Sequence, residues 1–313
     1  MTKHFCDRLC ESVKAKNSPL AVGLDPVFSR LPEDIRSKGS QTDEDFVIDA
    51  VFQFGCEVIK AVAQHVPAIK LNIAFFERYG YEGIECFHSL VTEAKEQQLE
   101  VIGDVKRGDI GHTCLAYADA YLSEHTFRTL GLKPSDAITI NGFAGSEGIE
   151  PFAERAGENG KGVFVWVRAS NSSAARLQDA VTADGQMFYE ILADITAEIA
   201  SMPKYIGESG YSCVGMVVGG TSPEHTTKLR EKYPNIWFLV PGFGSQGGEA
   251  VDCVRFCKPD GTGALINSSR GIIYAYEEHK YKSAFADDWR KCIEQAAIDA
   301  NKVLKDSFDK IYK

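Results

Sequence analysis

The chain has 313 residues, of which 44% are hydrophobic and 25% charged, the composition of a globular protein long enough to bury a large core. Its formal net charge of −10 argues against nucleic acid or an anionic membrane as a general partner. No apolar run approaches the roughly 18 residues of a membrane span, and the first residues lack the apolar core of a secretory signal. We therefore expect a cytoplasmic protein.

The nine cysteines are an odd number and are scattered over the whole chain. Two pairs, Cys6/Cys10 and Cys253/Cys257, have a spacing that could form half of a metal site. Neither pair is accompanied by a second Cys or His pair at the spacing of a zinc site. We therefore expect free, buried thiols in a reducing compartment.

Segments with helical periodicity alternate with short apolar runs along the chain. Phe5, Leu9 and Val13 lie at helical spacing and predict an amphipathic lead-in helix from Lys3 to Lys16. Residues 27–43 have the composition of a loop. Further helices are predicted over 45–66, 82–98, 113–130 (ended by Gly131), 147–156 and 184–202, from Ser222-Pro223 onward, and over 284–308. The predicted strands are Leu20–Pro26, Ala68–Ile73, Glu100–Lys106, Asp136–Gly142, Gly162–Ser170, Gly215–Thr221, Ile236–Gly242 and Gly263–Ser269.

Eight short strands separated by helical segments are the pattern of an α/β protein with a (β/α)8 TIM barrel. Right-handed crossovers between parallel strands make closure of such a barrel natural. No low-complexity linker divides the chain, so residues 1–313 are predicted to form a single barrel domain. The lead-in helix would precede the barrel, and a long amphipathic helix would follow it.

Seven of the eight predicted strands end in polar or charged side chains, whereas their first halves are apolar. In a barrel of this kind the carboxyl ends of all strands meet at one face, where the active site is built. A single polar strand end can simply meet solvent, but seven together predict one convergent site. The side chains concerned are Asp25, Lys70 and Asn72, Asp104 and Lys106, Thr139 and Asn141, Arg168 and Ser170, Thr221, and Ser268 and Arg270.

The stretch from Val101 to Thr113 is the most densely charged of these strand ends. Asp104 and Lys106 are two residues apart, so both side chains point to the same face of an extended strand. Taken alone, the stretch could also be a surface strand with a salt bridge, followed by a helix that Asp109 caps.

With Lys70 nearby, two cations and two anions would alternate, and each charge would have an opposite neighbour. Carboxylates beside Lys106 favour its ammonium form, which suits a proton donor better than a Schiff-base nucleophile. The lysines also neutralise the acids that would bind a metal. We therefore expect no metal at this site.

Two glycine-rich loops follow the last two predicted strands, at 241–248 and 267–271. Barrels of this class often bind a phosphate at that place through backbone N–H groups. Arg270 offers a fork of donors for phosphate oxygens, and Gln246 can donate from the preceding loop. The alternative is that the glycines only form turns and that Arg270 is a surface charge.

Five segments together resemble the orotidine 5′-phosphate decarboxylase family, in its longer bacterial-type subfamily. The resemblance extends over nearly the whole chain, and the Asp104 motif combined with the two glycine-rich loops makes it specific. The segments are Val22-Gly-Leu-Asp-Pro26, Lys70-Leu-Asn-Ile-Ala-Phe-Phe-Glu77, Asp104-Val-Lys-Arg-Gly-Asp-Ile-Gly111, Phe238-Leu-Val-Pro-Gly-Phe-Gly-Ser-Gln-Gly-Gly248 and Asn267-Ser-Ser-Arg-Gly271.

The resemblance implies the decarboxylation of orotidine 5′-monophosphate to UMP, the last step of de novo pyrimidine nucleotide synthesis, without a cofactor. It implies that Lys106 donates a proton to C6 of the pyrimidine. Asp104 would lie beside the substrate carboxylate, and Lys70 would complete the charge network. It also implies a homodimer in which Asp109 and Thr113 reach into the neighbouring subunit's site.

The same resemblance implies contacts to the rest of the nucleotide. Two segments depart from the family pattern, because Arg168-Ala-Ser-Asn171 replaces the usual Lys-Thr-Ser-Asn and Asn141-Gly-Phe-Ala-Gly145 replaces Asn-Pro-Tyr-Leu-Gly. The implied contacts are Asp25 and Asn72 to the ribose, Gln246, Arg270 and Gly271 around the phosphate, Pro241 near the base, and Ser170 and Asn141 at the pyrimidine edge.

Two other functions agree with parts of the pattern. A related barrel lyase that acts on a sugar phosphate with Mg²⁺ would need further acids beside Asp25 and Asp104, where Lys70 is expected instead. A non-catalytic nucleotide-phosphate-binding barrel would keep the glycine-rich loops but lose the charged residues. All four charged residues are present in this chain.

Overall fold

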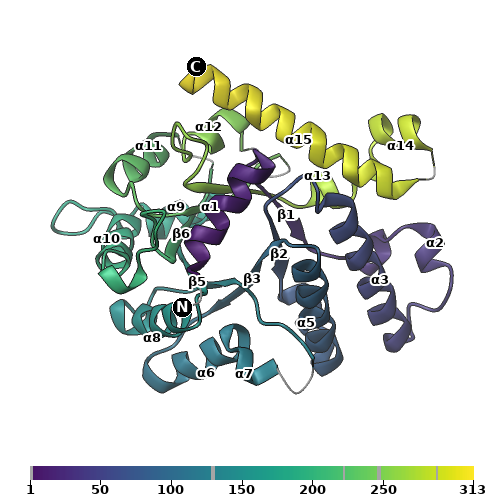
Figure 1. Cartoon of the computed structure of the whole chain (residues 1–313), viewed down its shortest axis with the longest axis horizontal. Helices are drawn as coiled ribbons and strands as arrows, with labels where there is room; N and C mark the ends of the chain where they lie inside the picture. The colour runs from purple at the N-terminus through teal and green to yellow at the C-terminus, as the bar shows by residue number, and fades with distance from the viewer. Residues whose placement is uncertain (1–2, 128–130, 221–222, 245–247, 287) are drawn as a thin grey trace.

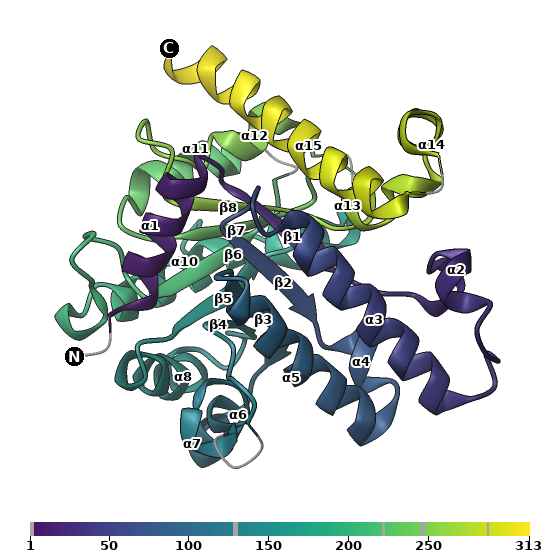
Figure 2. The same cartoon turned by 45° about the vertical axis from the view of Figure 1, so that its right-hand side comes forward.

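The structure is a computed structural model that describes residues 3–127, 131–220, 223–244, 248–286 and 288–313. Eight parallel strands follow one another in chain order and close into a barrel, because β8 pairs with β1 (Figure 2). The predicted (β/α)8 barrel is confirmed. The strands are β1 (Leu20–Leu24), β2 (Ala68–Asn72), β3 (Glu100–Arg107), β4 (Ala137–Ile140), β5 (Gly162–Arg168), β6 (Val214–Val218), β7 (Phe238–Pro241) and β8 (Ala264–Ser268).

Helices surround the barrel, and the last of them is the longest (Figure 1). The α-helices are α1 (Phe5–Lys16), α2 (Glu33–Arg36), α3 (Glu44–Val62), α4 (Ala74–Glu77), α5 (Gly80–Glu96), α6 (Gly111–Leu122), α7 (Glu124–Phe127), α8 (Ser146–Glu158), α9 (Ala175–Gln178), α10 (Phe188–Ala200), α11 (Pro223–Lys232), α12 (Ala250–Val254), α13 (Arg270–Ile273), α14 (His279–Phe285) and α15 (Trp289–Tyr312). Short 3₁₀ turns are η1 (Phe28–Arg30), η3 (Ser172–Ala174), η4 (Pro203–Tyr205) and η5 (Ala275–Glu277).

The predicted lead-in helix α1 lies across the amino end of the barrel (Figure 1). Its apolar face, with Phe5 and Leu9, packs into the barrel interior against Phe164 and Trp237. The rings of Phe5 and Phe164 meet edge to face with 6.0 Å between their centroids. This packing fills the amino half of the barrel, so open space inside it can lie only toward the carboxyl ends of the strands.

The predicted helix over 284–308 is shifted and divided in the structure. Ala286 has a φ of 52°, in the left-handed region that a right-handed helix excludes, so α14 ends before it. The Asp288 side chain then accepts a hydrogen bond from the Lys291 backbone N–H at 3.3 Å and caps the start of α15. The long C-terminal helix is confirmed, but with the bounds of α15.

Two further segments differ from the sequence prediction. The helix expected over 113–130 ends at Leu122, because Ser123 adopts an extended backbone with ψ 119°, and the short α7 follows. Residues 128–130 lie outside the described part of the chain. The loop expected over 27–43 contains η1 and α2 and is held by Tyr276, whose hydroxyl donates to the Arg30 carbonyl at 2.7 Å.

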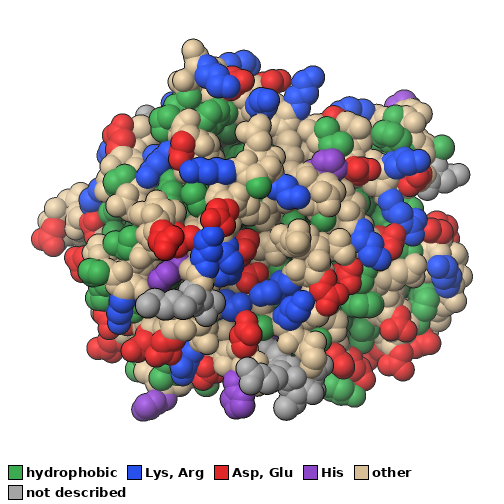
Figure 3. Space-filling model, in the orientation of Figure 1, with side chains coloured by type: hydrophobic (Ala, Val, Ile, Leu, Met, Phe, Trp, Pro, Cys, Tyr) green, Lys and Arg blue, Asp and Glu red, His purple; other side chains and the backbone are tan. Residues whose placement is uncertain are grey.

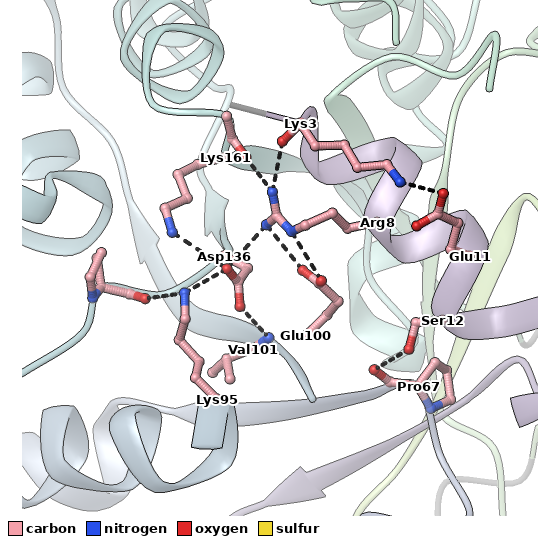
Figure 4. Close-up of polar contacts among 12 residues, drawn as sticks. Lys3, Arg8, Glu11, Ser12, Pro67, Lys95, Glu100, Val101, Asp136 and Lys161 are labelled. Atoms are coloured by element: carbon pink, nitrogen blue, oxygen red, sulfur yellow. Dashed lines mark hydrogen bonds and ion pairs between the residues drawn. The ribbon is translucent and has the colours of Figure 1, made fainter. Parts of the chain in front are cut away.

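A cluster of buried ions, here called the Asp136 cluster, lies where β3 and β4 begin, beside α1 (Figure 4). Asp136 accepts from Lys95 at 2.7 Å and lies 3.4 Å from Lys161. Arg8 of α1 contacts Asp136 at 3.1 Å and holds both oxygens of Glu100, also at 3.1 Å. The cluster therefore links α1 to the residues at the beginnings of β3, β4 and β5.

The surface across which α1 lies carries acidic and basic side chains interspersed with one another (Figure 3). All nine cysteines are free and eight are buried, as their spacing predicted. None of the described helices is both long and apolar enough to cross a membrane.

Candidate active site

A cavity of about 710 Å³ opens at the carboxyl ends of the strands. This volume lies within the range that small-molecule sites occupy. Polar side chains from the carboxyl ends of several strands therefore meet at one cavity, as the sequence predicted for most of them. Its described lining residues are Asp25, Lys70, Asn72, Asp104, Lys106, Thr139, Trp166, Ala169, Ser170, Asn171, Ser172, Val217, Leu239, Pro241, Gly242, Phe243, Asn267, Ser269 and Arg270.

Four of these residues form what we call the Asp104 cluster: Lys70, Asp104, Lys106 and Thr139. The Lys70 ammonium lies 2.7 Å from Asp104 Oδ2, and the Lys106 ammonium lies 2.6 Å from Asp104 Oδ1. The Thr139 hydroxyl donates to the same Oδ1 at 2.8 Å. One carboxylate, held between neighbouring strands β2, β3 and β4, is thus shared by two lysines.

The charges of this cluster stabilise one another. Burial raises the pKa of the Asp104 carboxyl, but the nearby Lys70 and Lys106 outweigh burial, and the net pKa lies well below its usual range. Burial lowers the pKa of Lys70, but Asp104 and then Asp25 oppose this effect, and the net pKa is raised. Asp104 is therefore ionised and Lys70 is a cation at neutral pH.

Lys106 reaches Asp104 from an uncommon backbone conformation. Its φ is 47°, and the pairing of β3 with β4 shifts register between Gly103 and Arg107. A left-handed conformation costs a residue with a side chain about 1–2 kcal/mol. The Lys106 side chain is 39% exposed, and its ammonium lies 5.9 Å from the centroid of the Trp166 ring. The strained backbone thus holds a cation at the cavity surface.

Most of the other predicted substrate contacts also line the cavity: Asp25, Asn72, Ser170, Pro241 and Arg270. One oxygen of Asp25 is buried without a hydrogen-bond partner among the described residues, and the same holds for the Asn267 side-chain oxygen. Buried acceptors in that state call for a donor from elsewhere, and a bound ligand with hydroxyl groups could supply it.

Of the residues to which the resemblance gave a role, four do not line the described part of this cavity and a fifth is not described; the polar strand ends Arg168 and Ser268 are also absent from its described lining, and Thr221 lies outside the described residues. Asp109 and Thr113 are exposed on the segment that follows β3. Asn141 is exposed, and its side-chain oxygen accepts from the Phe143 backbone N–H at 3.0 Å. Gly271 lies in α13 beside the lining residue Arg270. Gln246 lies outside the described residues.

Thr139, Trp166 and Asn267 also line the cavity, although the sequence predicted no substrate contact for any of them. The sequence counted Thr139 among the polar strand ends but gave it no role. Trp166 gave no signal, because a large apolar residue in an apolar strand is indistinguishable from core until the strand is placed.

Two of the residues that depart from the family pattern, Arg168 and Ala169, have a structural role beside the cavity. Arg168 holds both oxygens of Asp179, at 3.0 and 2.9 Å. The next residue, Ala169, donates its backbone N–H to Gln178 at 2.9 Å. These bonds tie α9 and the residue that follows it to the end of β5, so the cavity residues Ser170 and Asn171 lie in a segment held at both ends.

Comparison with known proteins agrees with this geometry. Residues 20–284, the greater part of the chain, match the model of the orotidine 5′-phosphate decarboxylase / HUMPS family. The chain belongs to this family.

Members of the family are similar to this chain along almost its whole length. It is 38% identical to an orotidine 5′-phosphate decarboxylase of Rhodopirellula baltica, over 96% of this chain and 99% of the relative. It is 37% identical to the Caldicellulosiruptor bescii protein of the same name, over 98% of both chains. The structure of Leishmania donovani OMP decarboxylase superposes with a TM-score of 0.71 at 29% identity and covers 98% of this chain and 99% of its own.

Proposed function

We propose that the protein is a carboxy-lyase that converts orotidine 5′-monophosphate to UMP, the last step of de novo pyrimidine nucleotide synthesis, without a cofactor. The observation that carries this proposal is the Lys106 ammonium, which lies 2.6 Å from the ionised Asp104 at the surface of a nucleotide-sized cavity. Family membership and the full-length relatives support the same reaction.

In the proposed reaction the substrate carboxylate lies against Asp104, and the two like charges repel each other. The bond between C6 and the carboxylate breaks, CO₂ leaves, and the electron pair stays on C6. The Lys106 ammonium faces this developing negative charge and stabilises it more strongly as the transition state is approached. Lys106 then transfers a proton to C6 and regains one from water.

The remaining cavity residues would bind the parts of the nucleotide that do not react. Arg270 is suited to the phosphate, with Gln246 and Gly271 from the adjoining loops. Asp25 and Asn72, which line the same cavity, would contact the ribose hydroxyls. Binding energy from these remote contacts can support the reaction at C6.

The pyrimidine itself would lie between these groups and the Asp104 cluster. Pro241 and Ser170 line the cavity and are suited to its face and edge. Asn141 would have to turn toward the cavity to reach the same edge, because its side chain is exposed and bonded to Phe143.

The proposal is tested by adding orotidine 5′-monophosphate to the purified protein and following the ultraviolet change on conversion to UMP, with and without EDTA. We expect turnover that EDTA does not affect. A requirement for Mg²⁺ would favour the sugar-phosphate lyase alternative. Binding of UMP without any turnover would favour the non-catalytic nucleotide-binding alternative.

We further propose a homodimer in which Asp109 and Thr113 complete the neighbouring subunit's site. Both residues are exposed and lie outside the described lining of their own chain's cavity. Ile110, the residue after Asp109, is 54% exposed. Phe143, two residues after Asn141, is 71% exposed. A subunit that packs here would cover both apolar side chains and bring Asp109 and Thr113 to its own cavity.

Mixing two inactive variants, Asp109→Ala and Lys106→Ala, tests the shared site. In a two-fold dimer with exchanging subunits, random mixing should restore roughly a quarter of the wild-type activity, because half the dimers are mixed and each has one intact site. If both variants fold and form mixed dimers but the mixture stays inactive, the subunits do not share their sites.

Residues 1–313 are proposed to act as one domain in the cytoplasm. The support is that α1 packs inside the amino end of the barrel and that α15 buries Trp289 and Ile293 against it. Nine free cysteines fit a reducing compartment. Fluorescence of a tagged copy in cells would test the location.

A further inference from the structure

Thr139 lies on β4, directly behind the two residues to which the proposed reaction assigns the chemistry. Its side chain is buried, with 2% of the residue exposed. We infer that Thr139 is a positioning residue whose hydroxyl joins the Asp104 side chain to the Lys106 backbone and holds both in register for proton transfer. This inference rests on the proposed function.

The direction of the two hydrogen bonds follows from the chemistry of their partners. Asp104 is ionised and can only accept, so the single hydroxyl proton of Thr139 points to Asp104 Oδ1, 2.8 Å away. The Lys106 backbone N–H can only donate, so it occupies a lone pair of the same hydroxyl, at 3.1 Å. Only a group that both donates and accepts can make this bridge.

The bridge gives Asp104 a partner that does not change during the reaction. Asp104 Oδ2 is held by Lys70 at 2.7 Å, whereas Oδ1 is held by Lys106 and Thr139. When Lys106 gives up its proton, its charge-assisted bond to Oδ1 weakens. The Thr139 bond to Oδ1 keeps its strength at that point, and the carboxylate keeps its orientation.

The bridge also supports the backbone of Lys106. This residue has a φ of 47°, in a stretch where β3 and β4 lose regular register. Such a conformation persists only where the surroundings hold it. The bond from the Lys106 N–H to Thr139 is a contact that does so, and it aims the side chain at the cavity.

The test compares Thr139→Val, which keeps the shape but loses both bonds, with Thr139→Ser, which keeps the hydroxyl. We expect Thr139→Val to lower kcat by roughly 10- to 100-fold, the cost of slight misplacement of reacting groups. KM for orotidine 5′-monophosphate and the affinity for UMP should stay near the wild-type values, because other residues bind ribose and phosphate. Thr139→Ser should recover most of kcat.

Thr196→Val is the matched control. Thr196 is also fully buried, and its hydroxyl donates to the Leu192 carbonyl within α10, outside the cavity lining. This variant should keep the wild-type kcat. If Thr139→Val does not fold, Thr139→Ala removes the same hydroxyl with less bulk and takes its place.

A kcat of Thr139→Val equal to that of the wild type would overturn the inference. So would a Thr139→Ser variant as slow as Thr139→Val, or a loss that is confined to KM. Absence of turnover in the wild-type protein is a different result, because it removes the proposed function and this inference with it.

Discussion

Strand β3 has a charged cluster at each end, and the two clusters use the same kinds of residues for different purposes. In each, one aspartate is shared between lysines: Asp104 contacts two at 2.7 and 2.6 Å, and Asp136 contacts two at 2.7 and 3.4 Å. The difference is access. The Lys106 side chain is 39% exposed toward the cavity, whereas the Lys161 side chain is 4% exposed.

Helix α1 explains this difference, because it crosses only the amino end of the barrel and adds Arg8 to the Asp136 cluster.

The clusters also differ in protonation. In the Asp104 cluster the cations dominate the single carboxylate and keep its pKa low. In the Asp136 cluster two carboxylates compete, and burial followed by repulsion from Asp136 raises the pKa of Glu100 to about 7 despite Arg8. A charged cluster can thus take part in a reaction where one of its cations is accessible to a ligand. Where its cations are largely buried, it stabilises the packing of the elements around it.

The largest expected effect separates the two clusters directly. Lys106→Ala should remove turnover, a loss of at least about 10⁴-fold if both proton transfer and charge stabilisation depend on it. It should leave the unfolding midpoint nearly unchanged, because the side chain is partly exposed. Steady-state rates and chemical unfolding of the same preparation measure both. Substantial residual activity would mean that the proton comes from another group.

Asp136→Asn should have the opposite pattern. Losing this charge leaves Arg8, Lys95 and Lys161 short of a buried partner, and breaking a buried ion pair costs about 3–5 kcal/mol of unfolding free energy. At a temperature where the variant is folded, kcat should remain that of the wild type. A folded variant with unchanged stability but reduced kcat would contradict the assembly role.

Because of Glu100, the contributions of the two charged clusters of β3 to folding stability depend on pH in opposite ways. Its pKa is raised from 4.5 to about 7 in the folded protein, so the folded state binds the proton more tightly than the unfolded chain. Its contribution to stability is therefore greatest below pH 4.5 and is lost as the pH rises through 7. A shift of this size corresponds to a loss on the order of 3 kcal/mol.

Glu100→Gln tests this by removing the titrating group while keeping an acceptor for Arg8. Unfolding free energies measured between about pH 5 and pH 8 should fall less with rising pH in the variant than in the wild type. Asp104, whose folded pKa is lowered, acts in the other sense, since its contribution is lost only as the pH falls through acid values. Parallel pH curves for the two proteins would contradict the role of Glu100.

The smallest effect is expected at Trp166. Its ring lies 5.9 Å from the Lys106 ammonium, and such a contact contributes about 0.5–1 kcal/mol at an accessible site. Trp166→Leu should therefore lower kcat only a few-fold, and Trp166→Phe should lower it less. Loss of turnover as complete as that of Lys106→Ala would assign Trp166 a larger role than this geometry gives it.

The order of strands and helices could be read from the sequence, because eight apolar runs, seven of them with polar ends, alternate with helical segments, and chain connectivity leaves few ways to pack them. The alternation of side chains along a strand also placed Asp104 and Lys106 on one face. Periodicity says which residues share a face but not which faces meet. The Asp136 cluster brings together residues as distant as Arg8 and Lys161, and no local pattern marked it.

What the sequence determined by itself was the barrel, the end of it that carries the site, and the pairing of a carboxylate with Lys70 and Lys106. Only the tertiary structure decided that Thr139 completes this group, that Asp109 and Asn141 lie outside the described cavity lining, and that α15 begins at Trp289. The physical reason is that hydrogen-bond direction and backbone strain depend on neighbouring strands at distances of a few ångströms. Composition and spacing along one chain do not contain those distances.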